Sequence, residues 1–407
     1  MIIEDSVMYD MATWSAPLAY NLEAYSSDRT INLTSNRVEE KKEQTGSLIN
    51  PDASYAYVID WNQRYAPKAL SMLWNKGYRV RSSQEAFGYE DLSFHAGSLI
   101  ILQGRNLELK SNWTADMNEI ADKTGVTIIG MNTGRMSTGN DLASRSSRTL
   151  EKPRVALLVE PPFSTYTCGQ LYYLFDQETE LAVDRVRTSI LSQTAMPKLG
   201  SRYGYADLND YDVLLLAGGG NNLSKIFEED QQKQLKDWVR NGGVIVATES
   251  ASSFFTKDRS QIGTVETKEP IKDQSEDAKY LHYADRTDYF GKKRIPGSAL
   301  YGHVDISHPL AFGLKEDLYS LSFNGQVLVP SSSLETVVHY ERDASKLLVS
   351  GYASQENLDH LAGLSTAAVE RIGSGKIVHL VDNTQYRMFW RGPSRMMQNA
   401  VMLLPSF

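Results

Sequence analysis

The sequence predicts an α/β protein with two units, each built around a β-sheet. Three apolar runs, at residues 155–159, 212–217 and 244–247, are continuous, which is typical of strands buried on both faces of a parallel sheet. Two other segments, 66–76 and 228–240, place apolar residues at helical spacing. Because strands and helices alternate along the chain, we expect sheets covered by helices.

Residues 53–150 are predicted to form the smaller unit. The predicted strands are 55–59, a short one at Val80, 98–102 and 126–129, and the predicted helices are 66–76 and 114–123. Gly77 is placed to end the first helix. This order of elements predicts a small Rossmann-like three-layer unit.

Residues 151–407 are predicted to form the larger unit, which has a strand-rich C-terminal part. Its first half contains the three continuous apolar runs. The strands predicted for the C-terminal part are 319–329, 335–340, 346–350, 366–371 and 376–382, followed by a helix from about Ser394. Residues 257–293 are charged and lack a clear period, which predicts an insertion or a long loop.

The chain ahead of the smaller unit divides into two stretches. Residues 1–22 are rich in apolar and aromatic side chains, among them Met11, Trp14 and Leu18. We expect them to pack on another part of the protein, because leaving this apolar area in water is unfavourable. Residues 23–52 are mainly polar and are expected to be a linker.

Charge and composition exclude several classes of partner. The 407 residues carry a net charge of −8, which repels nucleic acid, so no nucleic-acid partner is expected. Cys168 is the single cysteine, which excludes an internal disulfide and a thiolate-rich zinc site. No segment approaches ~18 consecutive apolar residues, so no membrane span is expected. Residues Met1–Asp5 lack the basic and apolar regions of a signal peptide.

Five segments carry a resemblance to a known family. They are Glu4–Pro17; Tyr57–Trp61 with Ala66–Leu70; Pro153–Leu158 with Cys168–Asp176; His308–Gly313; and Gly373–Val378 with Asp382, Asn383, Arg387, Trp390, Asn399 and Ala400. In this order they resemble the C-terminal half of large bacterial proteins of the zinc carboxypeptidase family, of the carboxypeptidase A type. The resemblance covers nearly the whole chain.

The resemblance implies that residues 151–407 form a class I glutamine amidotransferase-like, flavodoxin-like domain. It also implies that the peptidase chemistry lies in an upstream domain of the same parent protein, and that residues 1–22 are a remnant following that domain. The parent would use zinc to hydrolyse C-terminal peptide bonds of peptide substrates, in the periplasm or after secretion. This chain is then expected to be a non-catalytic accessory region without a cofactor of its own.

The seven histidines do not reproduce the zinc motif of that family, which is His-x-x-Glu with a distant second histidine. None has a glutamate three residues later; His282 and His379 have Asp285 and Asp382 at that offset. His379 lies within an apolar strand and is expected to be a hydrogen-bonded core histidine.

A second histidine cluster is formed by His303, Asp305 and His308. Its short spacing beside Pro309 is typical of a strand end followed by a turn. The alternative is a metal site, since these side chains are ligand types.

The amidotransferase-like fold implies a cysteine nucleophile at a tight turn between a strand and a helix. By register Glu249 occupies that position here, and Ser250 follows it. A glutamate cannot form the thioester that an amidotransferase needs, and the family's late His-x-Glu pair is absent. We therefore expect a degenerate elbow, with the Glu249 carboxylate near helix-start amides. The alternative is a small-ligand-binding or hydrolase module that uses Glu249, Ser250 or Cys168.

Two further features follow the buried strands of the larger unit. Cys168 is expected to be a packed structural thiol, with a reactive thiol at a helix start as the alternative. Gly218, Gly219, Gly220 and Asn221 are ligand-binding candidates, because backbone amides of such a loop can bind an anion. A tight strand-to-helix turn is the other interpretation.

Aromatic and basic residues gather near the C-terminus of the chain. They are Tyr386, Arg387, Phe389, Trp390 and Arg391. The pattern is compatible with a groove for carbohydrate or peptide, and equally with packing of a helix or turn.

Overall fold

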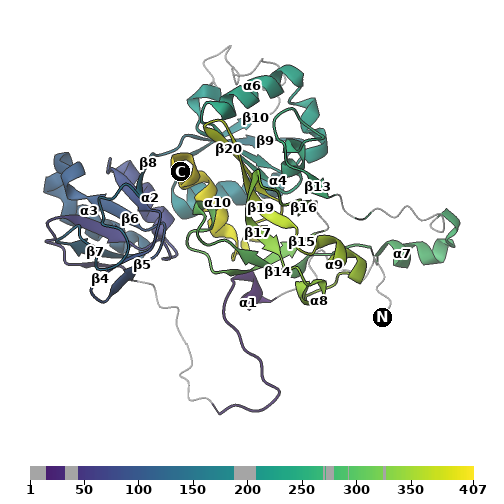
Figure 1. Cartoon of the computed structure of the whole chain (residues 1–407), viewed down its shortest axis with the longest axis horizontal. Coiled ribbons are helices and arrows are strands. Elements are labelled where there is room, and N and C mark those ends of the chain that lie inside the picture. Colours follow the sequence, from purple (N-terminus) through teal and green to yellow (C-terminus); the bar gives the residue numbers. More distant parts are fainter. Residues whose placement is uncertain are drawn as a thin grey trace. The chain divides into compact units, whose positions relative to one another are not determined.

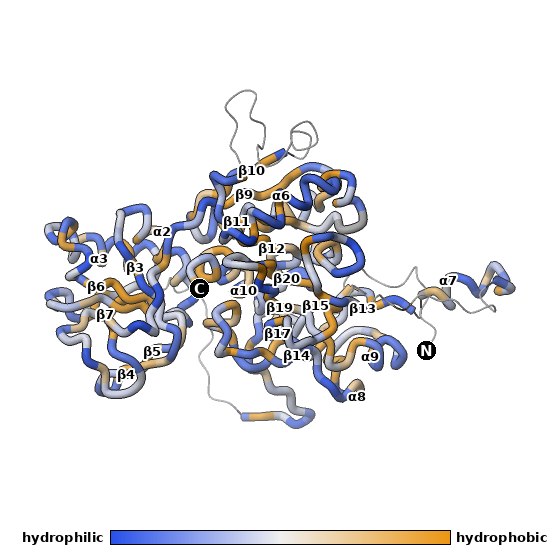
Figure 2. The backbone as a smooth tube through the Cα atoms, turned by 45° about the horizontal axis from the view of Figure 1, so that its top comes forward, coloured by the Kyte–Doolittle hydropathy of each residue, from blue (hydrophilic) through white to orange (hydrophobic). Residues whose placement is uncertain are grey.

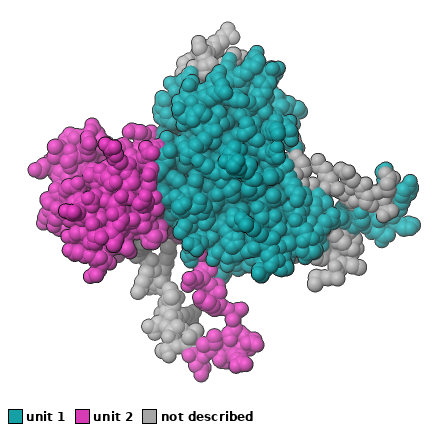
Figure 3. Space-filling view, viewed as in Figure 1, with its two compact units in different colours: residues 1–19, 153–405, 407 teal, residues 20–152, 406 magenta. Residues whose placement is uncertain are grey.

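The computed structural model describes residues 15–32, 45–187, 208–268, 271, 279–291, 293–323 and 327–407 (Figure 1). It confirms the mixed α/β fold class. The chain divides into two compact units, a smaller one formed mainly by residues 20–152 and a larger one formed mainly by residues 153–405 (Figure 3). Within the described part of the chain, no helix is long and apolar enough to cross a membrane.

The smaller unit is built on a six-stranded sheet in the order β1-β7-β2-β6-β3-β8. Its strands are β1 (Ser47–Ile49), β2 (Ala56–Ile59), β3 (Val80–Ser83), β6 (Leu99–Leu102), β7 (Thr127–Met131) and β8 (Ser147–Leu150). Of the neighbouring pairs in this sheet, β1 with β7 is parallel and the others are antiparallel. This differs from the parallel sheet of a Rossmann-like unit, because an apolar run gives a strand's burial but not the direction of its neighbours.

The linker expected at residues 23–52 is too long. Strand β1 lies within it and joins the sheet edge beside β7, through Leu48 opposite Ile128. The strand has three residues, of which Leu48 is half-buried and the other two are exposed, so it is too short to show a period in the sequence.

Two helices and a hairpin pack on this sheet. Helix α2 (Ala66–Asn75) contacts α3 (Trp113–Thr124), and each also contacts the sheet. The hairpin of β4 (Phe87–Tyr89) and β5 (Leu92–Phe94) stacks Phe87 on Phe94. These rings join a core cluster with Val58 and Ile100, from the middle of the sheet.

The first half of the larger unit is a parallel sheet. Its strands are β9 (Val155–Val159), β10 (Val183–Arg187), β11 (Val213–Ala217), β12 (Val244–Thr248) and β20 (Gly375–Leu380). They pair in the order β10-β9-β11-β12-β20, which is the 2-1-3-4-5 order of a flavodoxin-like fold. The accompanying helices are α4 (Thr165–Tyr172), which continues as a π-helical segment (Tyr173–Thr179), α6 (Glu229–Arg240) and α10 (Ser394–Met402). Figure 2 shows the apolar strands of this half in orange.

Beyond β20 the same sheet continues with antiparallel strands. These are β19 (Ser365–Ile372), β17 (Leu334–Tyr340), β14 (Ser298–Val304) and β15 (Asp317–Ser322), with β13 (Thr267–Lys268), β16 (Val327–Leu328) and β18 (Leu348–Ser350) attached at the side. The remaining helices of this half are α7 (Tyr283–Gly291), α8 (Ala344–Leu347) and α9 (Gln355–Leu361). The described residues of the insertion expected at 257–293 include the short strand β13 and helix α7.

The short helix α1 (Ala16–Ala19) belongs to the larger unit. Ala19 is fully buried in a cluster with Leu321 and Trp390, and Leu18 packs against that cluster. The Ala19 carbonyl oxygen accepts hydrogen bonds from the backbone amides of Arg391 and Gly392, at 2.7 Å each. This end of the 1–22 stretch packs on the α/β body; Met11 and Trp14 lie outside the described residues.

Candidate functional site

The carboxyl ends of the parallel strands meet at one edge of the larger sheet, where folds of this order form their ligand crevice. Backbone hydrogen bonds join the segments that follow these strands. Ser164, after β9, donates its amide hydrogen to the Ala217 carbonyl oxygen of β11 at 2.8 Å. Gly218, after β11, donates to the Thr248 carbonyl oxygen of β12 at 3.2 Å. The candidate residues of the elbow and the glycine loop therefore lie at the same edge.

Glu249 lies at a strained elbow directly after β12. Its φ is 51°, a left-handed conformation that is unfavourable for a residue with a Cβ atom, and it opens a 3-10 helix (Glu249–Phe255). Glu160, directly after β9, has a φ of 75° and is in the same region. Strained backbone of this kind persists where the surrounding structure holds it, and it is enriched at functional sites.

The carboxylate of Glu249 is held by two buried side chains. Thr167 of α4 donates its hydroxyl hydrogen to Oε2 at 2.6 Å. Asn383, just after β20, donates from Nδ2 to Oε1 at 3.3 Å, and the same nitrogen lies 3.2 Å from Oε1 of Gln170. The hydrogen bonds described for this carboxylate thus come from side chains of α4 and of the turn after β20.

Asp382 lies next to Asn383 and carries a second carboxyl group into this region. Its Oδ2 accepts a hydrogen bond from the Tyr340 hydroxyl at 3.0 Å. Burial, together with the negative charge of Glu249 and against the hydrogen bonds from Tyr340 and Ser320, raises the pKa of Asp382 to about 7. Near neutral pH the elbow region therefore combines the hydrogen-bonded side chain of Glu249 with a carboxyl group that holds a proton for part of the time.

The thiol of Cys168, the candidate cysteine nucleophile, is not activated. The Cys168 thiol is buried and lies 3.4 Å from the Leu158 carbonyl oxygen. Burial, followed by the charge of Glu249, raises the pKa of Cys168 to about 11, so the thiolate is scarce at neutral pH. Ser250 is exposed beside the elbow.

His379, which lies opposite Ala247 where β20 pairs with β12, contacts a serine other than Ser250. His379 of β20 is fully buried, and its Nδ1 lies 2.9 Å from Oγ of Ser252, which is also buried. On the other side, His379 Nε2 lies 3.7 Å from a carboxylate oxygen of Glu370. The expectation that His379 is a hydrogen-bonded core histidine is thus confirmed, whereas its neighbours Ser252 and Glu370 were not predicted from the sequence.

The second histidine cluster does not converge. Nε2 of His303 lies 2.8 Å from Glu341, and Nε2 of His308 lies 3.1 Å from Glu335. Asp305 instead accepts a hydrogen bond from the Ser307 amide at 3.0 Å. In the ranges that the structure describes, no group of three or more His, Cys, Asp or Glu side chains is placed to hold a metal ion.

The glycine loop forms a tight turn beside the elbow. Gly218 and Gly219 have φ values of 73° and 86°, and Gly220 and Asn221 begin the 3-10 helix that follows (Gly220–Lys225). A Cβ atom on Gly219 would lie 2.9 Å from the Pro162 carbonyl oxygen, so this approach requires glycine. A Cβ atom on Gly218 would lie 3.7 Å from Oγ of Ser250. The loop is thus a neighbour of the elbow, and the Gly218 amide is used within the fold.

The aromatic residues near the C-terminus pack inward. Trp390 is fully buried, and its indole nitrogen donates to the Tyr319 carbonyl oxygen at 2.8 Å. Tyr386 and Phe389 pack against the same cluster, and Arg391 pairs with Glu178. The interpretation as a groove is therefore wrong for Trp390, because its ring is enclosed by the core.

No protein-family model and no curated protein sequence matches the chain. Similar solved structures include a candidate ThuA-like protein from Parabacteroides merdae, with 12% identity, a TM-score of 0.38, and coverage of 63% of this chain and 91% of that chain. A candidate GMP synthase component from Thermoplasma acidophilum has 9% identity, a TM-score of 0.35, and coverage of 61% and 92%. For β-galactosidase from Bacillus circulans, the identity is 9%, the TM-score 0.32, and the coverage 85% and 49%. With TM-scores below 0.5, these similarities carry no argument about substrate or activity.

Proposed function

We propose that this chain is a non-catalytic accessory region of a zinc metallocarboxypeptidase-like protein. The observation that supports the non-catalytic part is the state of Glu249. It stands where the fold would place a nucleophile, and its carboxylate is an acceptor for Thr167 and Asn383. A carboxylate in this position cannot form the thioester of glutaminase chemistry. Peptide hydrolysis, and the peptide substrates, belong in this proposal to an upstream domain of the parent protein.

Zinc is implied by the resemblance for that upstream domain. The described residues of this chain do not fit it, since His303 and His308 are directed at separate carboxylates, Glu341 and Glu335. A catalytic zinc site needs three protein ligands that converge and leave one position for water. We therefore derive no step through a metal in this chain.

The non-catalytic proposal predicts no turnover by the purified chain. Ammonia release from glutamine, and release of the C-terminal residue from a blocked dipeptide with added zinc, should both equal the rate without protein. The matched variant is Glu249→Gln, which keeps the size of the side chain. Turnover by the wild-type chain that disappears in this variant would overturn the proposal.

The accessory role has a separate test in the gene. The reading frame upstream of Met1 should encode a domain with His-x-x-Glu and a distant histidine. A reading frame that starts at Met1 would contradict the accessory role. It would not bear on the proposal that the elbow is non-catalytic.

A second candidate function is a small-ligand-binding or hydrolase site at the elbow. The half-buried Glu249 beside Asp382 favours it, because a carboxylate and a protonated carboxyl group in one crevice can act as acceptor and donor. A panel of nitrophenyl esters and glycosides at pH 5 to 8 tests it. Turnover that Asp382→Asn and Glu249→Gln each abolish would favour this candidate over the accessory role.

A further inference from the structure

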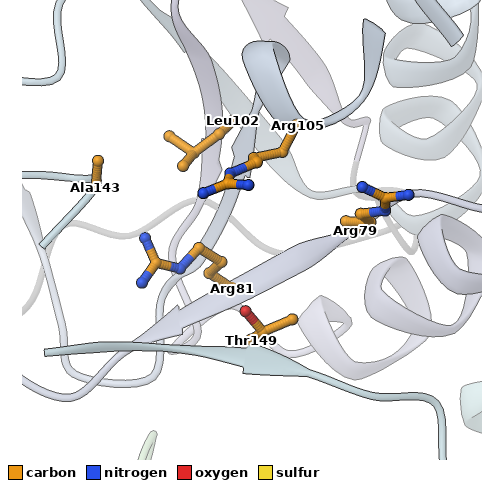
Figure 4. Close-up of a pocket in the computed structure, with 6 residues that line it drawn as sticks. All are labelled: Arg79, Arg81, Leu102, Arg105, Ala143 and Thr149. Atoms are coloured by element: carbon orange, nitrogen blue, oxygen red, sulfur yellow. The ribbon is translucent and has the colours of Figure 1, made fainter. Parts of the chain in front are cut away.

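A pocket in the smaller unit is lined by three arginines. Its volume is about 320 Å³, and its lining residues are Arg79, Arg81, Leu102, Arg105, Ala143 and Thr149. Figure 4 shows the guanidinium groups of Arg81 and Arg105 directed at the same space, with Leu102 and Ala143 at its border and the Thr149 hydroxyl facing it. None of these six residues is acidic.

The sheet brings these residues together from separate segments. Arg81 is the second residue of β3, and Arg79 directly precedes this strand. Arg81 pairs with Thr149 of β8 on one side and with Ile100 of β6 on the other. Arg105 ends the 3-10 turn that directly follows β6. Both neighbours of β3 therefore contribute to the pocket around its arginines.

Arg81 is fixed in place by the chain itself. Its Nη2 donates to the carbonyl oxygens of Ser144 at 2.9 Å and of Ser147 at 2.6 Å. Because these two bonds use only Nη2, they leave the N–H groups of Nε and Nη1 for other acceptors. A guanidinium that is already oriented loses less side-chain entropy when it binds a ligand.

Among the described residues that line the pocket, none carries a negative charge to balance its arginines. Arg81 loses proton affinity through burial and then through the charge of Arg105, so its pKa is lowered and the two groups repel each other. Arg79 lies 3.8 Å from Glu108, but both side chains are more than half exposed, so this ion pair is weak. An anion between Arg81 and Arg105 would convert a repulsion into two charge-assisted contacts.

We propose that this pocket binds a small molecule that carries a tetrahedral oxyanion, a phosphate or sulfate ester. A carboxylate is satisfied by one guanidinium fork, whereas the guanidinium groups of Arg81 and Arg105, which come from separate segments and face the same space, suit a group with more acceptor oxygens. The volume exceeds that of the oxyanion alone, and Leu102 and Ala143 offer apolar surface to an attached group. The site lies outside the unit that carries the elbow, so it is independent of the proposed function.

The test uses the full chain in a buffer free of phosphate and sulfate, with titration calorimetry of phenyl phosphate, phenyl sulfate and benzoate. Comparing phenyl phosphate with phenyl sulfate shows which of the two ester groups binds more tightly. Benzoate carries a planar carboxylate on the same phenyl ring and tests whether a tetrahedral oxyanion is required. We expect benzoate to bind at least about tenfold more weakly than the better of the two esters. Arg105→Glu should weaken ester binding by at least about tenfold, because it replaces an attractive charge by a repulsive one.

The matched control is Arg148→Glu. Arg148 is exposed on β8 and is the neighbour of Thr149, so its side chain lies on the other face of the sheet and does not line the pocket. The substitution Arg148→Glu changes the net charge by the same amount as Arg105→Glu. Its affinity should stay within about twofold of wild type. If Arg105→Glu does not fold, Arg105→Met takes its place with the same expected loss. No binding by wild type, equal binding of benzoate, or equal losses in the Arg105 and Arg148 variants would each overturn the proposal.

Discussion

The elbow of the larger unit and the arginine pocket of the smaller unit both hold charged side chains near the surface, but the charges are compensated differently. At the elbow, the carboxylate of Glu249 accepts hydrogen bonds from Thr167 and Asn383 of the same chain. In the pocket, Arg81 and Arg105 face each other, and the residues that line the space add no negative charge. A charge that is satisfied within the fold supports the structure, whereas a charge that faces its like is relieved only by an anion from solution.

The largest expected effect is at the elbow, from Asn383→Asp. This change replaces the buried amide donor of Asn383 by a carboxylate, next to Asp382 in the sequence. The hydrogen bond to Glu249 is then replaced by repulsion between two carboxylates. The free energy of unfolding at pH 8 should fall by about 2–4 kcal/mol. Urea denaturation measures it.

Acid should partly restore this variant, because the new carboxyl group can then be protonated. Thr167→Ser is the matched control, since it keeps the hydroxyl donor to Glu249 and should cost less. A loss in Asn383→Asp that is the same at pH 5 and pH 8 would show that charge at the elbow is not the cause.

An intermediate effect is expected from the pKa of Asp382. Its folded-state value of about 7 is above the unfolded value, so the folded state binds more protons between these two values. The free energy of unfolding should therefore fall as the pH rises from about 5 to 8, by at most about 1.4 kcal/mol per pH unit. Asp382→Asn keeps an acceptor for the Tyr340 hydroxyl and should flatten this slope. If the free energy of unfolding depended on pH in the same way in wild type and Asp382→Asn, Asp382 would not be the group responsible for the slope.

The smallest expected effect is in the pocket, from Arg105→Met. Removing one of two repelling charges should change the free energy of unfolding by no more than about 0.5 kcal/mol in an anion-free buffer. Arg81→Met is the contrasting variant, because it also removes the donor to the Ser144 and Ser147 carbonyl oxygens and should cost about 1–3 kcal/mol. Equal destabilisation by both would mean that Arg105 also supports the fold, and the contrast between the two regions would fail.

The sequence predicted the parallel half of the larger sheet because its central strands are continuous apolar runs. It did not predict β10, since this edge strand exposes Asp184, Arg185 and Arg187 and shows no apolar run. It also did not predict the antiparallel pairing of the smaller sheet. Burial can be read from a single strand, but direction is a property of its neighbours.

The candidate sites divide in the same way. The position of Glu249 follows from the register of β12, which is local. Its partners Thr167 and Asn383 lie 82 and 134 residues away along the chain, and no local pattern connects them to it. Arg79 and Arg81, which flank Val80, were a signal for the pocket, but Arg105 comes from a 3-10 turn and Thr149 from β8, and they form no basic run with the first two.

The position of β20 has a consequence for the synthesis of this protein. β20 pairs with β12 on one side and with β19 on the other, so it joins the two halves of the larger sheet. Yet β12 ends at Thr248 and β20 begins at Gly375. While the ribosome makes the segment between them, one edge of β12 has no native partner, and an apolar edge of this kind invites pairing with other nascent chains. The yield of folded protein should therefore depend on how well the cell shields that edge until translation reaches β20.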